Sequence, residues 1–310
     1  MPQSVSVYAM SSALESLEPW LAQQLPDLDA VARRHFTHLV AGIIEQQSLL
    51  LRQIAAASPF QAEAVSNFTQ VQRIIRDTRL TLEQVYYPLV RQLLAQIPPA
   101  DAYVTIDQTC HTDQYNVVVI GWASDAVSLP LGFLIYPTNG AWAEDARALL
   151  PQIQALFPAG QTITLLADRA YAADALIAAV EALDWQYLIR LPEDTLIQHP
   201  DAGWVAVRDL RQRAQRQRFF PDVRIWKGAT RTATVCLSRQ RTADGRTTTW
   251  YVVTNLVGDR TCFLAYACRW WQECTHKLLK SGMFNWEGGR VVIPGLIDTH
   301  WHATLASVSQ

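Results

Sequence analysis

Two aspartates, each at the end of an apolar run, are the residues whose setting first indicates metal chemistry. Asp107 closes the run in "YVTIDQT" and Asp168 closes the run in "TLLADRAY". In an α/β protein the carboxyl ends of the strands form the edge where ligands bind. A single aspartate after a strand is more often a helix cap or a turn residue. Two together favour a site for hard divalent cations, and two-metal phosphoryl transfer then requires a third carboxylate.

The segment "YACRWWQECTHKLLK" supplies a third carboxylate beside groups that suit phosphate. We expect a helix over Thr261 to Leu279, and its residues Tyr266, Arg269, Glu273 and Lys280 are offset by three, four and seven positions. All four therefore project from one helix face. A face with a phenol, a guanidinium, a carboxylate and an ammonium group is poor core material. It fits a site that holds a metal ion and a phosphate together.

This spacing, Y-(2)-R-(3)-E-(6)-K, resembles the signature of the insertion-sequence-four family of bacterial DDE transposases, and all four positions match. The upstream blocks "IDQT" and "LADRAY" resemble the first and second catalytic motifs of that family. The run "WYVVTNL" resembles the strand that leads into its third motif. The resemblance covers about residues 103–281, and its specificity comes from three motifs in the same order.

The resemblance implies a ribonuclease-H-like α/β core with a mixed sheet, interrupted by a β-rich insertion before the last catalytic helix. It implies that Asp107, Asp168 and Glu273 are catalytic and hold two Mg²⁺ ions, which Mn²⁺ can replace. In such a site water cuts the DNA strand and exposes a 3′-OH, which then attacks target DNA; positioning and charge stabilisation do nearly all the work. The implied partners are double-stranded DNA, as transposon ends and target, and a second copy in a homodimeric synaptic complex.

Further DNA-binding roles follow from the resemblance. Tyr266, Arg269 and Lys280 would hold DNA phosphate near the transposon end, and the N-terminal helical region, with its basic segment "QRIIRDTRL", would bind that end. Where family members release the element through a hairpin, an aromatic residue supports a flipped base, and Trp142 and Trp270 are candidates for that support. We also expect Trp270, with the tryptophan after it, to pack the helix against the sheet.

The arginine-rich stretch "RDLRQRAQRQRFF", residues 208–220, is the candidate surface for the DNA backbone. The formal net charge of −2 argues against nucleic-acid binding by the chain as a whole, but the arginines are concentrated here. Beside a phosphate-processing site, clustered guanidinium groups add affinity for the backbone without reading sequence. The alternative is a solvated face. The expected DNA contacts are Arg211, Arg213, Arg216 and Arg218.

Apolar periodicity and turn residues divide the chain into four segments. Residues 1–99 are an expected helical DNA-binding region, which ends at a proline pair. Residues 100–192 contain three consecutive strands, then helix, strand, helix and strand, which predicts the first part of an α/β catalytic core with a mixed sheet. Residues 193–257 form a β-rich insertion. Residues 258–310 carry the final catalytic helix and a C-terminal tail.

Composition excludes several other classes. A chain of 310 residues that is 50% hydrophobic can bury a substantial core. It has no charge-free apolar stretch of the roughly 20 residues that a membrane span needs, and its start lacks the pattern of a signal peptide. We therefore expect a cytoplasmic, nucleoid-associated protein with no membrane partner. The five scattered cysteines form no CxxC pair, so they indicate neither a disulfide framework nor a zinc module.

Two other polar clusters have simpler explanations. Asp298, His300 and His302 in the C-terminal "DTHWH" would share one side of a strand. A zinc site would need a second pair of ligands, which the sequence lacks. His111 and Asp113 are better explained by a polar turn between two strands than by acid–base catalysis.

Three functions remain open from the sequence. An active DDE transposase is favoured by the intact carboxylates and the intact four-residue pattern. A metal-dependent nuclease without strand transfer has the same chemistry, and the sequence does not separate the two. The rival from another class is a non-catalytic DNA-binding protein, a relic or domesticated transposase, which would need none of these residues. Relatives often continue into further helices that help them dimerise, whereas this chain ends at Gln310.

Overall fold

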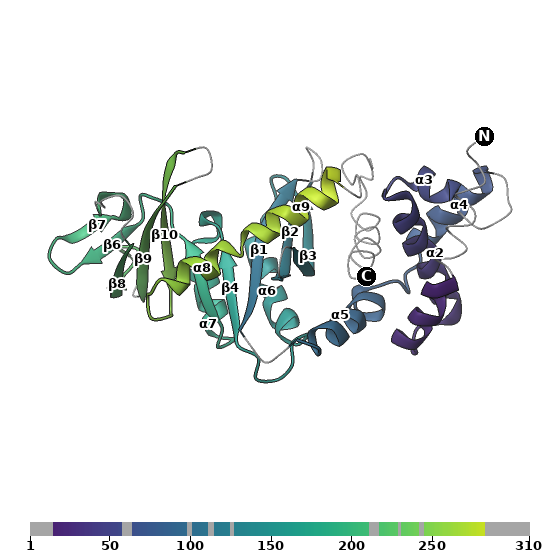
Figure 1. Ribbon diagram of the computed structural model, residues 1–310, viewed down its shortest axis with the longest axis horizontal. Helices are drawn as coiled ribbons and strands as arrows, with labels where there is room; N and C mark the ends of the chain where they lie inside the picture. Colours follow the sequence, from purple (N-terminus) through teal and green to yellow (C-terminus); the bar gives the residue numbers. More distant parts are fainter. Residues whose placement is uncertain are drawn as a thin grey trace.

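A single eight-stranded sheet forms the centre of the molecule (Figure 1). The computed structural model describes residues 15–57, 64–97, 101–110, 115–124, 127–210, 217–228, 231–241 and 245–282. The strand order is β3-β2-β1-β4-β5-β10-β9-β8. The strands are β1 (Ala102–Cys110), β2 (Tyr115–Ala123), β3 (Ser128–Pro137), β4 (Ile163–Ala167), β5 (Gln186–Arg190), β8 (Gln217–Arg224), β9 (Thr232–Arg241) and β10 (Thr247–Thr254).

The first five strands form a ribonuclease-H-like core. β2 runs antiparallel to both β1 and β3, whereas β1, β4 and β5 are parallel to one another. Antiparallel neighbours can be joined by short turns, whereas parallel neighbours need a crossover, usually a helix. Helices α6 (Ala143–Gln154) and α7 (Asp174–Glu181) lie in these crossovers. The expected mixed α/β sheet, with its order of three strands, helix, strand, helix and strand, is confirmed.

The segment that carries the third carboxylate is broken, and the prediction of one continuous helix was wrong. It consists of α8 (Thr261–Ala267), α9 (Trp270–Lys277) and the π-helical turn η4 (Leu278–Gly282). Between α8 and α9 the amides bond to carbonyls three residues back, as Arg269 N does to Tyr266 O at 3.1 Å. Because the sheet twists, this break lets the two helices follow different parts of its surface.

Helices cover both faces of the sheet. A Cβ added to Gly132 of β3 would lie 2.9 Å from Cδ1 of Ile153 in α6. A Cβ added to Gly121 of β2 would lie 2.7 Å from Oε1 of Gln272 in α9. Gly132 pairs with Ile120, the neighbour of Gly121, so the two glycines face opposite sides. Figure 1 shows α8 and α9 crossing the sheet as one diagonal yellow path. Burial on both faces explains why the strands are continuous apolar runs.

Strands from the expected insertion continue the core sheet. β10 pairs antiparallel with β5, and β9 and β8 follow it outward. The hairpin β6 (Leu196–His199) and β7 (Gly203–Ala206) forms a separate two-stranded sheet. Arg231, just before β9, pairs with Asp174 and Glu181 of α7. Backbone pairing and ion pairs therefore join the insertion to the core.

The N-terminal region is helical, as expected. Figure 1 shows its helices at one end of the molecule and the insertion strands at the other. None of the helices that the structure describes has the length and apolar character of a membrane span. Residues 15–24 are helical. They are followed by α2 (Ala30–Gln46), α3 (Leu51–Ala56), α4 (Ala64–Ile75), the π-helical η1 (Leu82–Tyr86) and α5 (Tyr87–Leu94).

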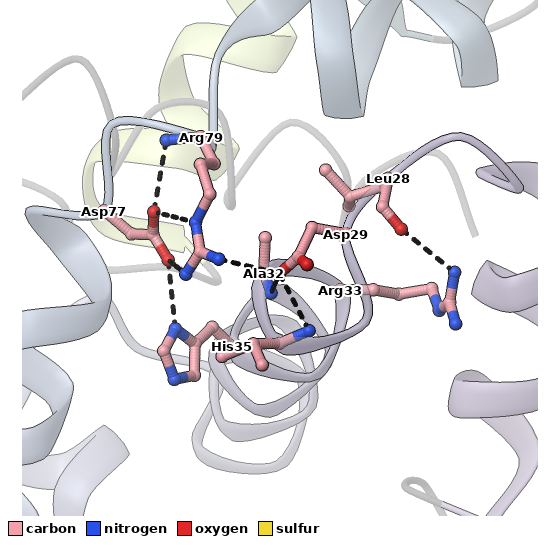
Figure 2. Close-up of polar contacts among 8 residues, drawn as sticks. Leu28, Asp29, Ala32, Arg33, His35, Asp77 and Arg79 are labelled. Carbon is pink, nitrogen blue, oxygen red and sulfur yellow. Dashed lines mark hydrogen bonds and ion pairs between the residues drawn. The ribbon is translucent and has the colours of Figure 1, made fainter.

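Arg79, from the basic segment "QRIIRDTRL", is held by acidic residues of the protein itself (Figure 2). Its guanidinium lies 2.7 Å from Asp77 and 2.7 Å from Asp29, and Asp77 also contacts His35 at 3.1 Å. Asp29 caps α2 by accepting hydrogen bonds from two amides of its first turn. The hydrogen bond from Arg79 lowers the pKa of Asp77. Arg79 therefore fastens the loop after α4 to the start of α2.

Candidate active site

The parallel pairing of β1 and β4 brings Asp107 and Asp168 to the same edge of the sheet. The ladder between these strands ends at the pair Ile106 and Ala167, so each aspartate is the next residue along its strand path. Neighbouring strands lie about 4.8 Å apart. The sequence predicted Asp107 at the end of its strand. Asp107 lies inside β1 instead, because β1 continues to Cys110 in its pairing with β2. The two carboxylates nevertheless start from adjacent positions.

Arg269 links the carboxylates of the first and third motifs. Its Nη1 donates to Asp107 Oδ2 at 3.3 Å, and its Nη2 donates to Glu273 Oε1. The side chains are largely withdrawn from solvent, with exposed fractions of 14% for Arg269, 17% for Asp107 and 31% for Glu273. One planar guanidinium thus pairs with two carboxylates from different elements. Asp168 Oδ1 accepts a hydrogen bond from the amide of Arg169 at 2.6 Å.

Burial dominates the electrostatics of Asp107. It raises the pKa of Asp107 to about 6, because the charged form loses hydration. This value includes the positive charge of Arg269 and the amide of Gln108, which lower the pKa of Asp107, and the negative charges of Glu273 and Asp168, which raise it. The three carboxylates are therefore close enough to influence the same ionisation. A cation at this position would offset the cost of burying their charge.

A buried hydrogen bond connects the strand of Asp107 to the helix of Glu273. Gln272 Oε1 accepts a hydrogen bond from Oγ1 of Thr105 at 2.8 Å. Thr105 lies two residues before Asp107 on the same face of β1, and Gln272 directly precedes Glu273. Both partners are fully buried. This contact therefore holds together the backbone segments that carry Asp107 and Glu273.

The same polar interface extends along α9. Thr275 Oγ1 donates to the carbonyl of Ser128 at 2.9 Å and accepts from its amide at 2.8 Å. Gln272 Nε2 lies 2.8 Å from His276 Nε2. Burial, together with the positive charges of Lys280 and Arg269, lowers the pKa of His276 to about 4. The His276 ring is consequently neutral near pH 7, and α9 is fixed to the sheet without a buried charge.

Trp270 does not pack α9 against the sheet, which corrects the expectation from the sequence. It is 49% exposed, and the Lys277 ammonium lies 4.7 Å from the centre of its ring. The polar side chains Gln272, Thr275 and His276 occupy the buried face instead. Trp142, the other aromatic residue considered for base support, is half-buried and contacts Tyr171 edge-on, with ring centres 5.1 Å apart.

Tyr266 and Lys280 lie in different environments from Arg269 and Glu273. Tyr266 is 3% exposed and contacts Trp250 edge-on at 5.2 Å, within the apolar cluster under α8. Burial raises the pKa of Tyr266 to about 12, against the lowering effect of the positive charges of Arg269 and Arg190. Its hydroxyl is therefore near the site although its ring is core. Lys280 is half-buried in η4.

Part of the expected DNA surface can be placed. Arg218 is exposed on β8, with its guanidinium 4.8 Å from the ring centre of Phe220. Arg73 and Arg76 of the basic N-terminal segment are exposed as well. Several residues singled out in the sequence lie outside the described residues: Arg211, Arg213, Arg216, His111, Asp113, Asp298, His300 and His302.

Sequence reasoning missed the residues that support the carboxylates. Thr105 gave no signal, because a threonine in a strand is ordinary. Gln272, Thr275 and His276 do recur at helical spacing, but a polar stripe usually faces solvent. Tyr171, three residues after Asp168, was visible as part of "LADRAY" and received no role. A rule that examines each polar residue beside a catalytic motif would have found it.

The donor set suits a hard divalent cation. All three side chains present carboxylate oxygen, the ligand that such cations prefer. Within the described part of the chain no three ligating side chains stand together in metal-binding geometry. Here the Arg269 guanidinium forms ion pairs with two of the three carboxylates and places a positive charge beside them.

The chain is similar to a known protein family and to solved structures. A family profile described as "Transposase DDE domain" matches residues 105–292, which is more than half of the chain and contains all three carboxylates. No curated protein matches the chain significantly. Among solved structures, a cryo-EM structure of a piggyBac transposase synaptic complex with hairpin DNA is similar, with a TM-score of 0.49 and 9% identity over 98% of this chain and 73% of that chain. On the family match, the chain belongs to the DDE-domain transposases.

Proposed function

We propose that the chain is a transposase of the insertion-sequence-four type, which cuts DNA at transposon ends and joins the exposed 3′-OH to target DNA. The observation that carries this proposal is the link through Arg269 between Asp107 and Glu273, beside Asp168. This link joins residues from two distant motifs, and the charge of Asp168, from a third motif, acts on the same Asp107 carboxylate.

The catalytic roles follow from the chemistry of the side chains. DDE transposases generally use divalent metal ions. Asp107, Asp168 and Glu273 would hold two Mg²⁺ ions, or Mn²⁺ in their place, which supply Lewis acidity and activate water. Burial of Asp107 limits the screening of its charge by water. Gln272 and Thr105 keep the carboxylates in place through their hydrogen bond.

The phosphate-binding roles fall to the cationic residues around the carboxylates. Arg269 offers a planar guanidinium that binds carboxylate or phosphate equally well. Lys280 would contribute a point charge and Tyr266 a hydroxyl near the same place. Arg218, and with it Arg211, Arg213 and Arg216, would contact the DNA backbone beyond the site.

The partners are double-stranded DNA and a second copy of the chain. Strand transfer requires that both transposon ends be held together, which a homodimeric synaptic complex achieves. An enzyme that acts on chromosomal DNA would work at the nucleoid.

The test is an assay with purified protein, Mg²⁺ and DNA that carries the flanking repeats of its own locus. We expect cleavage and joining by the wild type and loss of both in Asp107→Ala, Asp168→Ala and Glu273→Ala. Asp184→Asn serves as the matched control, because Asp184 is exposed and its positive φ of 57° is one that asparagine tolerates. Cleavage without joining would indicate a nuclease, and DNA binding alone would indicate a non-catalytic DNA-binding protein. Equal activity in all four variants would contradict the assignment.

A further inference from the structure

Tyr171 lies close to the carboxylates, and its hydroxyl takes no part in the hydrogen bonds that connect them. It ends the short 3-10 turn Arg169–Tyr171 that follows Asp168, and its amide donates to the carbonyl of Asp168 at 2.9 Å. Its ring contacts the ring of Trp142 edge-on. The centre of the Trp142 ring also lies 6.3 Å from that of the Tyr136 ring. Tyr171 is 2% exposed. The side chain is therefore fixed in one place next to the site.

The hydroxyl of Tyr171 has no hydrogen-bond partner among the described residues. A buried polar group without a partner is rare in native proteins, because it loses its bonds to water and gains none in return. Burial raises the pKa of Tyr171, and the nearby charges of Asp107 and Asp168 raise it further. The hydroxyl therefore keeps its proton and acts as a donor that faces acidic groups.

The protein acceptors near this hydroxyl already receive other donors. Asp168 Oδ1 accepts from the amide of Arg169, Asp107 Oδ1 from the amide of Gln108, and Asp107 Oδ2 from Arg269. The hydroxyl of Tyr266, also buried, likewise has no partner among the described residues, whereas two other tyrosines have acceptors. The fully buried Tyr86 donates to the carbonyl of Pro130, and Tyr136 donates to Gln108 Oε1 at 2.9 Å. Each carboxylate oxygen can accept a second hydrogen bond, yet none of them accepts one from Tyr171. A molecule that enters the site would supply an acceptor for this hydroxyl.

We propose that the Tyr171 hydroxyl donates a hydrogen bond to a non-bridging oxygen of the DNA phosphate that binds over Asp107 and Asp168. The inference rests on the proposed function, since it assigns a phosphate contact to the same site. A phosphate brings several oxygen acceptors, and it is the group on which the proposed reaction acts. A neutral donor suits this position, because it stabilises the oxygen's charge without competing for the carboxylates as a cation would.

The test compares Tyr171→Phe with Tyr86→Phe, each of which removes one buried hydroxyl. Three quantities are measured: the Tm of the protein without metal, the Kd for duplex DNA with Ca²⁺, and the single-turnover cleavage rate with Mg²⁺. Ca²⁺ serves to measure binding apart from cleavage. Tyr171→Phe should keep or raise the Tm, because the hydroxyl it removes has no partner, and should weaken Kd or slow cleavage by about tenfold to a hundredfold. Tyr86→Phe should lower the Tm and leave Kd and rate unchanged.

Each outcome decides the proposal. Unchanged Kd and rate in Tyr171→Phe would overturn it, and so would a lowered Tm, since the hydroxyl would then have a partner within the protein. If the wild type binds DNA but does not cleave it, the proposed transposase activity fails and the comparison of Kd values still decides the role of Tyr171. If the wild type does neither, both proposals fail.

Discussion

At the scale of single residues, Arg269 shapes the site by pairing with two carboxylates at once. Its contact with Glu273 was predictable, because residues four apart on a helix are neighbours. Its contact with Asp107 depends on how α9 lies across β1, which no local spacing reveals. The sequence therefore predicted which residue types belong together, whereas the partner of each charge came from the packing of distant elements.

The buried charge of Asp107 should make it a destabilising residue in the metal-free protein. Its pKa of about 6 exceeds the value of about 3.9 in an unfolded chain. The stability that Asp107 contributes is therefore complete below about pH 4 and is lost as the pH rises through 6. We expect Asp107→Asn to raise the free energy of unfolding at pH 7.5 by on the order of 1–3 kcal/mol.

Thermal melting of both proteins between pH 5 and 7.5, without metal, measures this effect. The Tm advantage of Asp107→Asn should grow with pH, because asparagine does not titrate. An advantage that is the same at both ends of the range would show that the Asp107 carboxylate does not lose a proton there.

At the scale of elements, the docking of α9 determines where Glu273 stands. The sequence predicted helical structure here and placed Arg269 and Glu273 on one helix face, where they pair. It missed the break before α9 because the apolar residues of α8 and the polar stripe of α9 have the same helical period. It also misassigned the buried face, since Gln272, Thr275 and His276 reach partners in strands far away in sequence. Such partners satisfy polar groups that would otherwise remain in water.

Gly121→Ala should disturb this docking. An added Cβ would lie 2.2 Å from Oγ of Ser128 and 2.7 Å from Oε1 of Gln272. We expect a loss of stability of about 1–3 kcal/mol, as for other overpacked sites, and a fall in DNA cleavage because Glu273 moves with α9. Gly228→Ala is the matched control, since nothing lies within 4 Å of its added Cβ. Melting and cleavage assays on both variants measure this, and equal Tm values for the two would contradict it.

At the scale of the whole molecule, the sheet was predictable in its order of elements but not in its extent. The sequence indicated a core, a β-rich insertion and a final helix, and the order of strands and helices in the core is confirmed. The pairing of β10 with β5 joins residues more than sixty positions apart, such as Val253 and Ile189. Nothing in the composition of either strand selects that neighbour. The insertion thus looked separate in sequence and proved continuous with the core sheet.

The overall charge of the molecule bears on how it would bind DNA. With a net charge of −2, affinity for the DNA backbone must come from local basic surfaces such as that around Arg218. We expect Arg218→Ala to weaken binding to all sequences alike and to reduce the slope of log K against log salt by about 0.9. Arg147→Ala is a control, because Arg147 lies on α6, across the sheet from α9. Fluorescence anisotropy over a range of salt concentrations measures the slopes; an unchanged slope in Arg218→Ala would remove β8 from the DNA surface.

We expect Asp107, Asp168 and Glu273 to form one metal site. Anomalous diffraction from crystals of the protein with DNA and Mn²⁺ would locate the metal ions. We expect anomalous peaks bonded to these three carboxylates. In Glu273→Gln crystals the peak at the position bonded to Glu273 should be lost. Peaks that avoid the three carboxylates, with Mn²⁺ bound elsewhere on the chain, would contradict this expectation.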